Sequence, residues 1–529
     1  MLFRRKKKTL QKLESRFGHL KTEGFNFQLI TRYTAHKDHS STFQEISNQT
    51  GNDLDFDLFF CFVDRTSSKI GQQFLYDRLK TIDDRTEEFV VQEKIITYLE
   101  KNPKEQLEIQ YLLNKLNNHQ TYYIPDLFQK EIERKPKWFF LFPILSFTAI
   151  LSILLSFFNP NVALILFGLF PINILIHYGL KRKTTLFLNS VPSLLAMGAV
   201  AKNLLKVKVI RDSFSEISPS IKVIASIRRN MSFFKLEQKV DSDMEAAYWF
   251  LLELIKITFL LEPLLLFSSL DKLQNKAKDI ENVFRFIGQV DTFVSVASLR
   301  KGEPYCTPTI NKNNRTIQFT DLRHPLVPHC VPNSVDTQKS ILLTGSNMSG
   351  KTTFIRSIGL NYISGIALNT CFASAASLPV ARLFSVIRIE DDVLNASSYF
   401  YREVDEIKEI IEQSGKSTRS IILLDELFKG TNTAERIAAA KAVLSYLEQQ
   451  NSQIFVSTHD IELTTLLGDK FDLFHFTESI VDSSIYFDYK IKKGISQSGN
   501  ALKIIAIHQY PEAIVKEAEE LLHTMKRNY

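Results

Sequence analysis

The chain has 529 residues, with 44% hydrophobic and 23% charged residues and a formal net charge of +7. This composition is ordinary for a globular protein, and the length suffices for about three domains. The four cysteines, at positions 61, 306, 330 and 371, are far apart and lack metal-ligand spacing, which excludes a disulfide framework and favours reduced thiols in the cytosol. The small basic excess is compatible with nucleic acid or an anionic membrane surface as a partner.

Residues 1–50 form a basic N-terminal segment, which starts with Arg4-Arg5-Lys6-Lys7-Lys8. The residues that follow, 9–16, are polar, whereas a secretory signal would continue with an apolar core, so the sequence predicts no export. The basic cluster is expected to contact anionic lipid or nucleic acid, or else to be a solvated tail.

Helical patterning with few glycines or prolines covers residues 51–130 and resumes over residues 185–300. Two apolar runs lie between these regions, residues 138–158 and 162–180, and neither contains Asp, Glu, Lys or Arg. At ~1.5 Å rise per residue, each run as a helix covers about the ~30 Å hydrocarbon core of a bilayer. The sequence therefore predicts a helical domain that is interrupted by a two-helix transmembrane hairpin at residues 138–180.

The residues around the two apolar runs predict the orientation of the hairpin. The turn between the runs, residues 159–161, is uncharged, and basic residues flank the pair on both outer sides, at positions 130, 134, 135 and 137 and at positions 181–183. Because basic flanks stay in the cytoplasm, we expect a multi-pass protein of the inner (cytoplasmic) membrane. The alternative is a buried helical hairpin in the core of a soluble protein.

A third apolar run, residues 249–270, differs from the first two because Glu253, Lys256 and Glu262 interrupt it. This pattern predicts a buried amphipathic helix rather than a membrane span.

Beyond residue 301 the pattern changes to short β-rich runs that alternate with helices. The predicted strands are residues 315–319, 340–344, 384–389, 420–424, 453–456 and 485–489. This alternation is typical of a mixed α/β nucleotide-binding domain, which we expect at residues 301–529.

The strongest motif in this region is a phosphate-binding loop, Gly345-Ser346-Asn347-Met348-Ser349-Gly350-Lys351-Thr352, which fits G-x-x-x-x-G-K-[ST]. It lies between the predicted strand 340–344 and a helix-compatible run, residues 353–363. Glycines let successive N–H groups face the phosphates, and the helix N-terminus adds positive potential. We expect Lys351 to contact the β- and γ-phosphates of ATP, and the Thr352 hydroxyl to ligate Mg²⁺.

Two further predicted strands end in side chains that ATP hydrolysis uses. Residues 421–424 are followed by Asp425-Glu426, and residues 453–456 are followed by Ser457-Thr458-His459. An acidic pair after a buried strand is costly unless it meets a cation or a polarised water. We expect Asp425 to hold the Mg²⁺ shell, Glu426 to orient or deprotonate the attacking water, and His459 to contact the γ-phosphate or that water.

Further sequence patterns surround these motifs. They are residues 321–327 (DLRHPLV), residues 397–400 (SSYF) with Glu403, and residues 430–433 (GTNT). With the loop and the two strand ends, they resemble the ATPase domain of the MutS DNA mismatch repair family, from roughly residue 315 to the C-terminus. Upstream, residues 62–75 are similar to the start of the helical core of that family, and residues 498–514 look like its closing helical segment.

The resemblance implies an α/β P-loop ATPase domain of the ABC type, preceded by an all-α domain like the MutS core, which here contains the transmembrane hairpin. It implies ATP and Mg²⁺ as cofactors. The nucleotide-binding residues would be the whole loop, including Asn347 and Ser349, together with Thr353. The catalytic residues would be Lys351, Glu426 and His459.

The resemblance also implies a homodimer with two ATP sites at the subunit interface. Ser397 and Ser398 would then lie at a helix start and reach the γ-phosphate that the other subunit holds. Residues 430–433 would cross the interface beside the partner's site.

The sequence departs from the family pattern at several points. Only about 50 residues precede the helical core, so the mismatch-reading domain with its Phe-x-Glu motif has no room. Phe428-Lys429 stands where Gly-Arg is usual, and Asn395 where a glycine is usual. Cys330-Val331 stands where an aromatic residue often stacks on adenine. These departures affect DNA recognition more than ATP binding.

Two functions fit the sequence. The first is an ATP-switched, MutS-like dimer that is tethered to the membrane and binds DNA non-specifically or at branched structures. The second is a membrane ATPase that acts on a protein or lipid partner without a nucleic-acid role. A transporter subunit is disfavoured because two spans are few and the sequence has no Leu-Ser-Gly-Gly signature.

Overall fold

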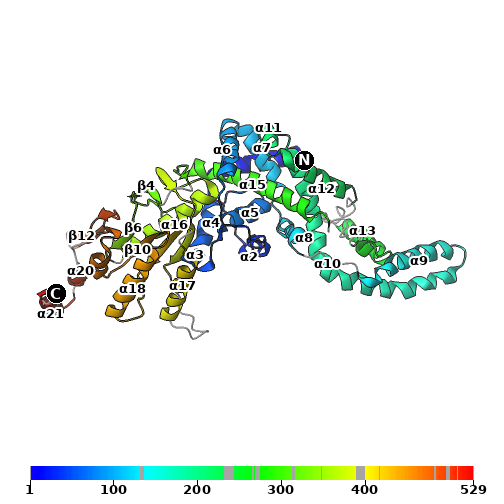
Figure 1. Ribbon diagram of the computed structural model, residues 1–529. Coiled ribbons are helices and arrows are strands. Elements are labelled where there is room, and N and C mark those ends of the chain that lie inside the picture. Colours follow the sequence, from blue (N-terminus) through cyan, green and yellow to red (C-terminus); the bar gives the residue numbers. More distant parts are fainter. Residues whose placement is uncertain are drawn as a thin grey trace. The chain divides into compact units, whose positions relative to one another are not determined.

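The computed structural model describes residues 2–130, 136–230, 243–264, 267, 275–311, 316–346, 348–388, 399–415, 418–481, 484–495, 501–508 and 510–527 (Figure 1). The contacts within the chain define two compact units. The first, here called the helical unit, comprises Met1–Asp38, Asp64–Asp77 and Val91–Ser298. The second, here called the sheet unit, comprises His39–Val63, Arg78–Val90 and Leu299–Tyr529.

Every element assigned in the described part of the helical unit is helical, and three helices run on into the sheet unit. The elements are α1 (Leu2–Arg16), α2 (Phe27–Ile30), η1 (Thr34–His36), α5 (Lys69–Lys80), α6 (Thr86–Lys101), α7 (Pro103–Asn114), η2 (His119–Tyr123), α8 (Asp126–Gln129), η3 (Lys137–Phe140), α9 (Leu141–Ser156), η4 (Pro160–Ala163), α10 (Leu164–Leu204), α11 (Lys208–Ser213), η5 (Ser215–Ile217), α12 (Ser218–Asn230), α13 (Asp243–Thr258) and α15 (Ala277–Gly302). The main core of the unit gathers apolar residues of α15, the end of α10, α5 and α7.

The start of α5 illustrates how this core sets the local structure. The Asp291 carboxylate, on α15, accepts hydrogen bonds from the backbone N–H groups of Ser67 and Ser68, at 2.8 Å each, and from the Ser68 hydroxyl. That hydroxyl caps α5 by accepting from the N–H of Gly71 at 2.9 Å. A Cβ on Gly71 would lie 2.1 Å from a carboxylate oxygen of Asp291, so only glycine fits one turn into the helix. Burial raises the pKa of Asp291 to about 6, although these hydrogen bonds oppose the shift.

Helices α9 and α10 form the hairpin that the sequence predicts (Figure 1). Two stretches, Lys137–Ser156 and Pro160–Leu180, are long and apolar enough to cross a membrane, and only 17% and 11% of their windows are buried. Helix α9 buries Phe142, Ser146, Ala149 and Ser152, whereas Phe147 of α9 and Phe167 of α10 are 65% and 77% exposed. The hairpin therefore exposes several large apolar side chains.

The prediction of one buried amphipathic helix over residues 249–270 is wrong. Helix α13 ends at Thr258, and the chain turns at Leu260, which has a positive φ of 47°. Moreover, Phe250 and Leu251 are 63% and 55% exposed. The charged residues of the run do not mark an exposed side of the helix, since Glu253 is buried.

The sheet unit contains a six-stranded sheet in the order β14-β11-β6-β10-β9-β8. Its strands are β6 (Ser340–Thr344), β8 (Arg382–Val386), β9 (Ser420–Asp425), β10 (Ser452–Ser457), β11 (Phe471–His475) and β14 (Lys492–Lys493). From β11 to β8 all neighbours are parallel, and β14 is antiparallel at the edge. Parallel strands buried on both faces explain the continuous apolar runs in the sequence.

Helices cover both faces of this sheet. One face carries α17 (Tyr399–Gln413) and α18 (Thr433–Glu448), whose apolar residues share a core with Ile422, Leu424 and alternate residues of the neighbouring strands. The opposite face carries α16 (Lys351–Leu368): a Cβ on Gly359 of α16 would lie 2.8 Å from the side chain of Leu423. Successive side chains of β9 thus point to opposite faces of the sheet, and each face packs against its own layer of helices.

The remaining elements of the sheet unit surround this layered core. They are β1 (Gln44–Glu45), α3 (Asn48–Asp53), α4 (Phe56–Val63), β2 (Thr81–Ile82), β3 (Thr309–Ile310), β4 (Gln318–Leu322), β5 (Asn333–Val335), β7 (Ala375–Leu378), α19 (Glu462–Leu467), β12 (Glu478–Val481), β13 (Ser484–Phe487), α20 (Ala501–Ile507) and α21 (Glu512–Arg527). Strands β3, β7, β4 and β5 form a second sheet, and β12 pairs with β13.

Candidate functional site

The carboxyl ends of three adjacent parallel strands bring the predicted site residues to one edge of the sheet. In the register of the sheet, Ser457 at the end of β10 pairs with Leu343 of β6 on one side and with Asp425 of β9 on the other. The phosphate loop, residues 345–352, therefore leaves β6 beside the acidic pair that follows β9. Ligands of open α/β sheets bind at this edge.

The loop backbone requires glycine at two positions. Gly345 has φ of 139°, and a Cβ there would lie 2.6 Å from the carbonyl oxygen of Phe476. Gly350 has φ of 109° and is the N-cap residue of α16, which begins at Lys351. The loop thus packs against the buried Phe476 and leads directly into the N-terminus of α16, an 18-residue helix.

The buried Lys351 side chain lies inside the loop. Its Nζ donates to the carbonyl oxygens of Gly345 and Ser346, at 2.8 and 2.9 Å. Burial lowers the pKa of Lys351, and the neighbouring Glu426 and Asp425 partly offset this shift. The ammonium group is therefore satisfied by two carbonyl oxygens, which are weaker partners than phosphate oxygens.

Thr352 and Asp425 lie in contact, as a shared metal site requires. The Thr352 hydroxyl donates to one carboxylate oxygen of Asp425 at 2.7 Å, and the Ser457 hydroxyl donates to the other. In the described residues, no group of three or more His, Cys, Asp or Glu side chains could hold a metal by itself. A hydroxyl with a single carboxylate suits Mg²⁺, which keeps waters and phosphate oxygens as its other ligands.

Glu426 follows Asp425 in a left-handed backbone conformation, with φ of 53°. One carboxylate oxygen contacts His459 Nε2 and the other forms an ion pair with Lys429 Nζ, each at 2.7 Å. Burial alone would raise the pKa of Glu426, but the hydrogen bonds from His459 and Lys429 outweigh it and lower this pKa to about 2. The three residues form one cluster. Lys429 contacts the Glu426 carboxylate, which was expected from the sequence to orient or deprotonate the attacking water.

Replacing Lys429 with methionine is expected to raise the pKa of Glu426. A contacting opposite charge shifts a carboxyl pKa by about 1–3 units, so the acidic limb of the pH dependence of kcat/KM for ATP hydrolysis should move upward by about one pH unit. A general base must be ionised to act, so activity is lost as the pH falls through its pKa. A higher pKa of Glu426 therefore causes this loss at a higher pH. Lys470→Met, which removes an exposed partner of Glu448, is the matched control. An acidic limb identical in both variants would contradict the coupling.

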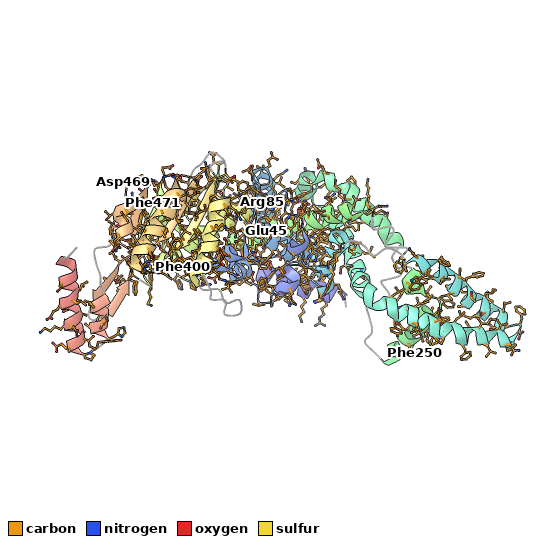
Figure 2. All side chains as sticks on the ribbon, turned by 60° about the horizontal axis from the view of Figure 1, so that its bottom comes forward. Glu45, Arg85, Phe250, Phe400, Asp469 and Phe471 are labelled. Atoms are coloured by element: carbon orange, nitrogen blue, oxygen red, sulfur yellow. The ribbon has the colours of Figure 1, made fainter. Side chains whose placement is uncertain are left out.

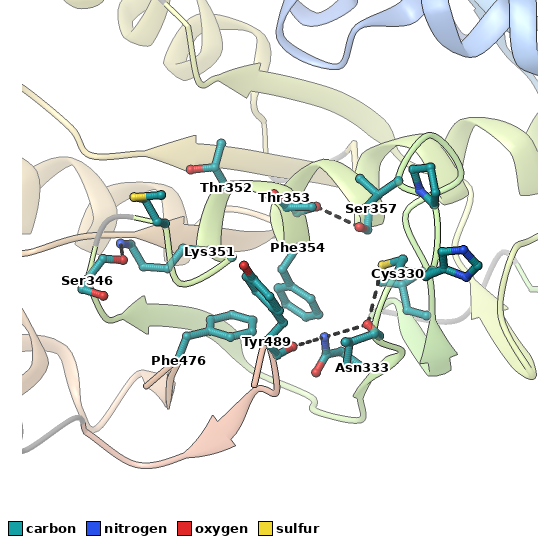
Figure 3. Close-up of a pocket in the computed structure, with 17 residues that line it drawn as sticks. Cys330, Asn333, Ser346, Lys351, Thr352, Thr353, Phe354, Ser357, Phe476 and Tyr489 are labelled. Atoms are coloured by element: carbon teal, nitrogen blue, oxygen red, sulfur yellow. Dashed lines mark hydrogen bonds between the residues drawn. The ribbon is translucent and has the colours of Figure 1, made fainter. Parts of the chain in front are cut away.

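A cavity of about 460 Å³ extends from the phosphate loop (Figure 3). Its lining includes Ser346, Met348, Gly350, Lys351, Thr352 and Thr353 from the loop and helix, and Cys330 and Val331 from the preceding strand region. Its walls also contain Phe476 and Tyr489, which sequence reasoning missed. The side chain of Asn333 donates to the backbone carbonyl of Tyr489 at 2.9 Å and holds it beside the cavity. Aromatic rings therefore line the cavity despite the Cys330-Val331 pair.

Other predicted residues lie elsewhere. Asn347, Asn395, Ser397 and Ser398 fall outside the described residues. Within residues 430–433, Asn432 caps α18 by accepting from the N–H of Glu435 at 3.0 Å. Glu403 is buried and accepts a hydrogen bond from the N–H of Phe428, so it supports the segment that carries Lys429. The cavity lining does not include Asp425, Glu426 or His459. Asp425 adjoins the cavity because it accepts a hydrogen bond from Thr352, which lines it.

The layered sheet, the glycine loop and the carboxylate pair define a mixed α/β domain with a candidate nucleotide site. The family model MutS domain V matches residues 341–526. The MutS resemblance is therefore confirmed for this part of the chain, which is similar to domain V of the MutS family.

Several relatives match somewhat less than half of the chain. The DNA mismatch repair protein MutS of Haloquadratum walsbyi is 31% identical over 258 residues, which is 46% of this chain and 27% of that protein. The DNA mismatch repair proteins MutS of Pseudothermotoga lettingae and Petrotoga mobilis are 31% and 32% identical, over 47% and 46% of this chain and 32% and 31% of those proteins. The chain thus spans less than a third of the length of each of these relatives.

Proposed function

We propose that this protein is a MutS-like ATPase, an ATP-switched and DNA-binding homodimer that is tethered to the membrane by residues 138–180. One observation carries the ATPase proposal: the loop with Lys351, the Thr352–Asp425 pair and Glu426 meet at one edge of the sheet. ATP would bind with its phosphates on the loop and its base in the cavity. Mg²⁺ held by Thr352 and Asp425 would neutralise charge on the phosphates.

Each residue of the site has a task that follows from its position. Loop N–H groups and the α16 N-terminus would stabilise the charge of the phosphates, with the Lys351 ammonium among them. Glu426 would orient the attacking water or take its proton once Lys429 releases the carboxylate. His459, which contacts Glu426 in this structure, would hold that carboxylate or the water.

Dimerisation is supported by an exposed apolar surface on the described part of the C-terminal segment. Helix α21 is amphipathic, and its Ile514, Leu521 and Leu522 are 50%, 60% and 40% exposed. A second copy of the chain is the partner that the MutS resemblance implies. Dimerisation would also bring in the Ser397 and Ser398 of the partner, as the sequence suggests.

The membrane tether is supported by the hairpin. Exposure of its apolar side chains to water is unfavourable, and each of its two helices is long enough to cross the hydrocarbon core of a bilayer. This tether would keep the ATPase domain in the cytoplasm.

DNA binding is supported by the MutS match and by the basic excess of the chain. Exposed basic residues on α1, namely Arg4, Lys7, Lys8 and Lys12, offer one surface for phosphates. The second candidate function, action on a protein or lipid partner, is favoured by the hairpin and by relatives that match only about half of the chain.

A DNA titration distinguishes these two functions. Protein in nanodiscs of neutral lipid would be titrated by fluorescence anisotropy against duplex, mismatched and four-way-junction DNA. If DNA is the partner, the affinity should fall steeply between 50 and 200 mM salt, by roughly tenfold or more for a few phosphate contacts, and a non-hydrolysable ATP analogue should change it. A variant with Arg4, Lys7, Lys8 and Lys12 changed to glutamine tests the α1 surface. Absence of any salt-sensitive affinity would leave the protein or lipid partner as the function.

A further inference from the structure

A cluster of ionisable side chains is buried against the hairpin. His177, on α10, lies with its Nε2 3.4 Å from a carboxylate oxygen of Glu253 and 3.5 Å from one of Glu262. The ammonium group of Lys256 lies 3.2 Å from Glu262 and 3.6 Å from Glu253. The four side chains are at most 12% exposed. Each carboxylate therefore has both an imidazole and an ammonium group as neighbours.

The outward face of α13 is apolar. Phe250, Leu251 and Ile255 are 63%, 55% and 38% exposed, whereas Glu253 on the same helix is buried (Figure 2). A helix on the surface of a soluble protein turns its charges outward and its apolar side chains inward. The arrangement of α13 is the inverse, as expected where hydrocarbon rather than water surrounds a helix.

The backbone after α13 is also arranged for a place without water. A helix C-terminus leaves carbonyl groups without intrahelical partners, and the Thr258 carbonyl accepts a hydrogen bond from the Asn173 side chain at 2.8 Å. The chain then turns at the fully buried Leu260. Further on, Phe267 packs against Phe139 and Phe142 at the start of the hairpin, with ring centroids 5.4 and 6.3 Å apart.

We propose that residues 243–264 with Phe267 form a third membrane-embedded element, which enters the bilayer beside the hairpin and turns back at Leu260. Its helical part within residues 249–258, where Glu253 and Lys256 face the cluster and Phe250, Leu251 and Ile255 are exposed, is about 15 Å long at ~1.5 Å per residue. This length is half of the ~30 Å hydrocarbon core, so the element does not span it. The ionic cluster of His177, Glu253, Lys256 and Glu262 docks the element on α10. Lipid is the occupant of its outer face. This inference rests on the proposed membrane hairpin.

Tryptophan fluorescence tests the inference directly, because the chain contains two tryptophans, Trp138 before α9 and Trp249 on α13. Trp138→Phe leaves Trp249 as the reporter, and Trp249→Phe leaves Trp138. Each full-length variant would be reconstituted into phosphatidylcholine vesicles with bromine atoms at defined depths of the acyl chains. We expect acyl-chain bromines to quench both tryptophans.

The outcomes separate this inference from the proposed hairpin. Quenching of Trp138 without quenching of Trp249 would overturn the third element and leave the hairpin in place. Quenching of neither residue would overturn the hairpin together with the third element.

The docking role of the cluster needs a charge variant. In the Trp138→Phe background, Lys256→Glu places three carboxylates beside His177, and we expect the loss of Trp249 quenching because unpaired charges leave hydrocarbon. The same substitution in the Trp249→Phe background should keep Trp138 quenched, which shows that the hairpin remains inserted. Lys278→Glu, at an exposed position of α15, is the control for the charge change. The milder Lys256→Met should weaken Trp249 quenching in the same direction. Unchanged Trp249 quenching in both Lys256 variants would overturn the docking role.

Discussion

Replacing Lys351 with alanine is expected to abolish nucleotide binding at working ATP concentrations. In this structure the ammonium group is buried and binds two loop carbonyl oxygens, at 2.8 and 2.9 Å, at the position where phosphates would arrive. Hydrogen bonds between charged groups contribute about 1.5–3 kcal/mol each, so the loss of such contacts raises Kd by at least roughly ten- to a hundredfold. The alanine also removes the charge that balances the phosphates.

Equilibrium binding of a fluorescent ATP analogue to the full chain in nanodiscs would measure this loss. Lys339→Ala is the matched control, because Lys339 precedes β6 and its Nζ donates to the exposed carbonyl of Asp469 at 3.0 Å. The control should bind as the native chain does. ATP affinity in Lys351→Ala equal to that of the control would refute the assignment of the loop.

Changing Glu426 to glutamine is expected to trap bound ATP with little turnover. Glutamine keeps the shape of the side chain but cannot accept a proton from water, and general-base catalysis contributes about 10²–10⁴-fold. The rate constant of a single turnover should therefore fall by about that factor while the affinity for ATP persists or increases. The substitution also removes the carboxylate that Lys429 and His459 contact, so the ion pairs of the free site are lost together with the base.

Radiolabelled ATP recovered intact on filtered protein would reveal the trapped state. Glu448→Gln, which loses a partly exposed ion pair with Lys470 at the end of α18, controls for the general effect of the substitution. If Glu426→Gln hydrolysed ATP at the rate of this control, the catalytic role of Glu426 would be refuted. Reduced hydrolysis by a variant that also fails to retain ATP would instead assign Glu426 a role in ATP binding.

The sequence predicted the parts of the fold that consecutive residues specify. The strand before the phosphate loop, residues 340–344, is β6 with the same bounds, β9 extends one residue beyond the prediction at its end, and β10 extends one residue beyond it at each end. These strands are buried on both faces, so their apolar runs are unbroken. The strand predicted at residues 384–389 starts two residues earlier and ends three residues earlier, as β8. Strand β11 was missed because Asp472 and His475 interrupt its apolar pattern; Asp472 accepts a hydrogen bond from Thr337.

The rest of the site depends on contacts that sequence spacing does not encode. Tyr489 lines the cavity although it lies 156 residues from Asn333, the residue that holds its carbonyl. The pairing of Lys429 with Glu426 was likewise not predicted, since the left-handed backbone at Glu426 and Phe428 creates it. In α13, charge alone was a misleading guide, because Glu253 lies beside His177 of α10 and Lys256 pairs with Glu262 beyond the turn. The catalytic and metal-binding roles of the site residues stay predictions.

The length of α10 has a mechanical consequence. This single helix of 41 residues contains one arm of the hairpin and also buries Leu194, Met197 and Leu204 in the core of the helical unit. At ~1.5 Å per residue it is about 60 Å long, and Pro192 interrupts its backbone hydrogen bonds between the hairpin arm and the core residues. If the hairpin lies in a bilayer, this continuous helix couples the helical unit to the span, and Pro192 is the place where the helix can bend. Any rotation of that unit during a nucleotide cycle beyond this bend would tilt the span itself, and bilayer thickness would oppose or favour the stroke.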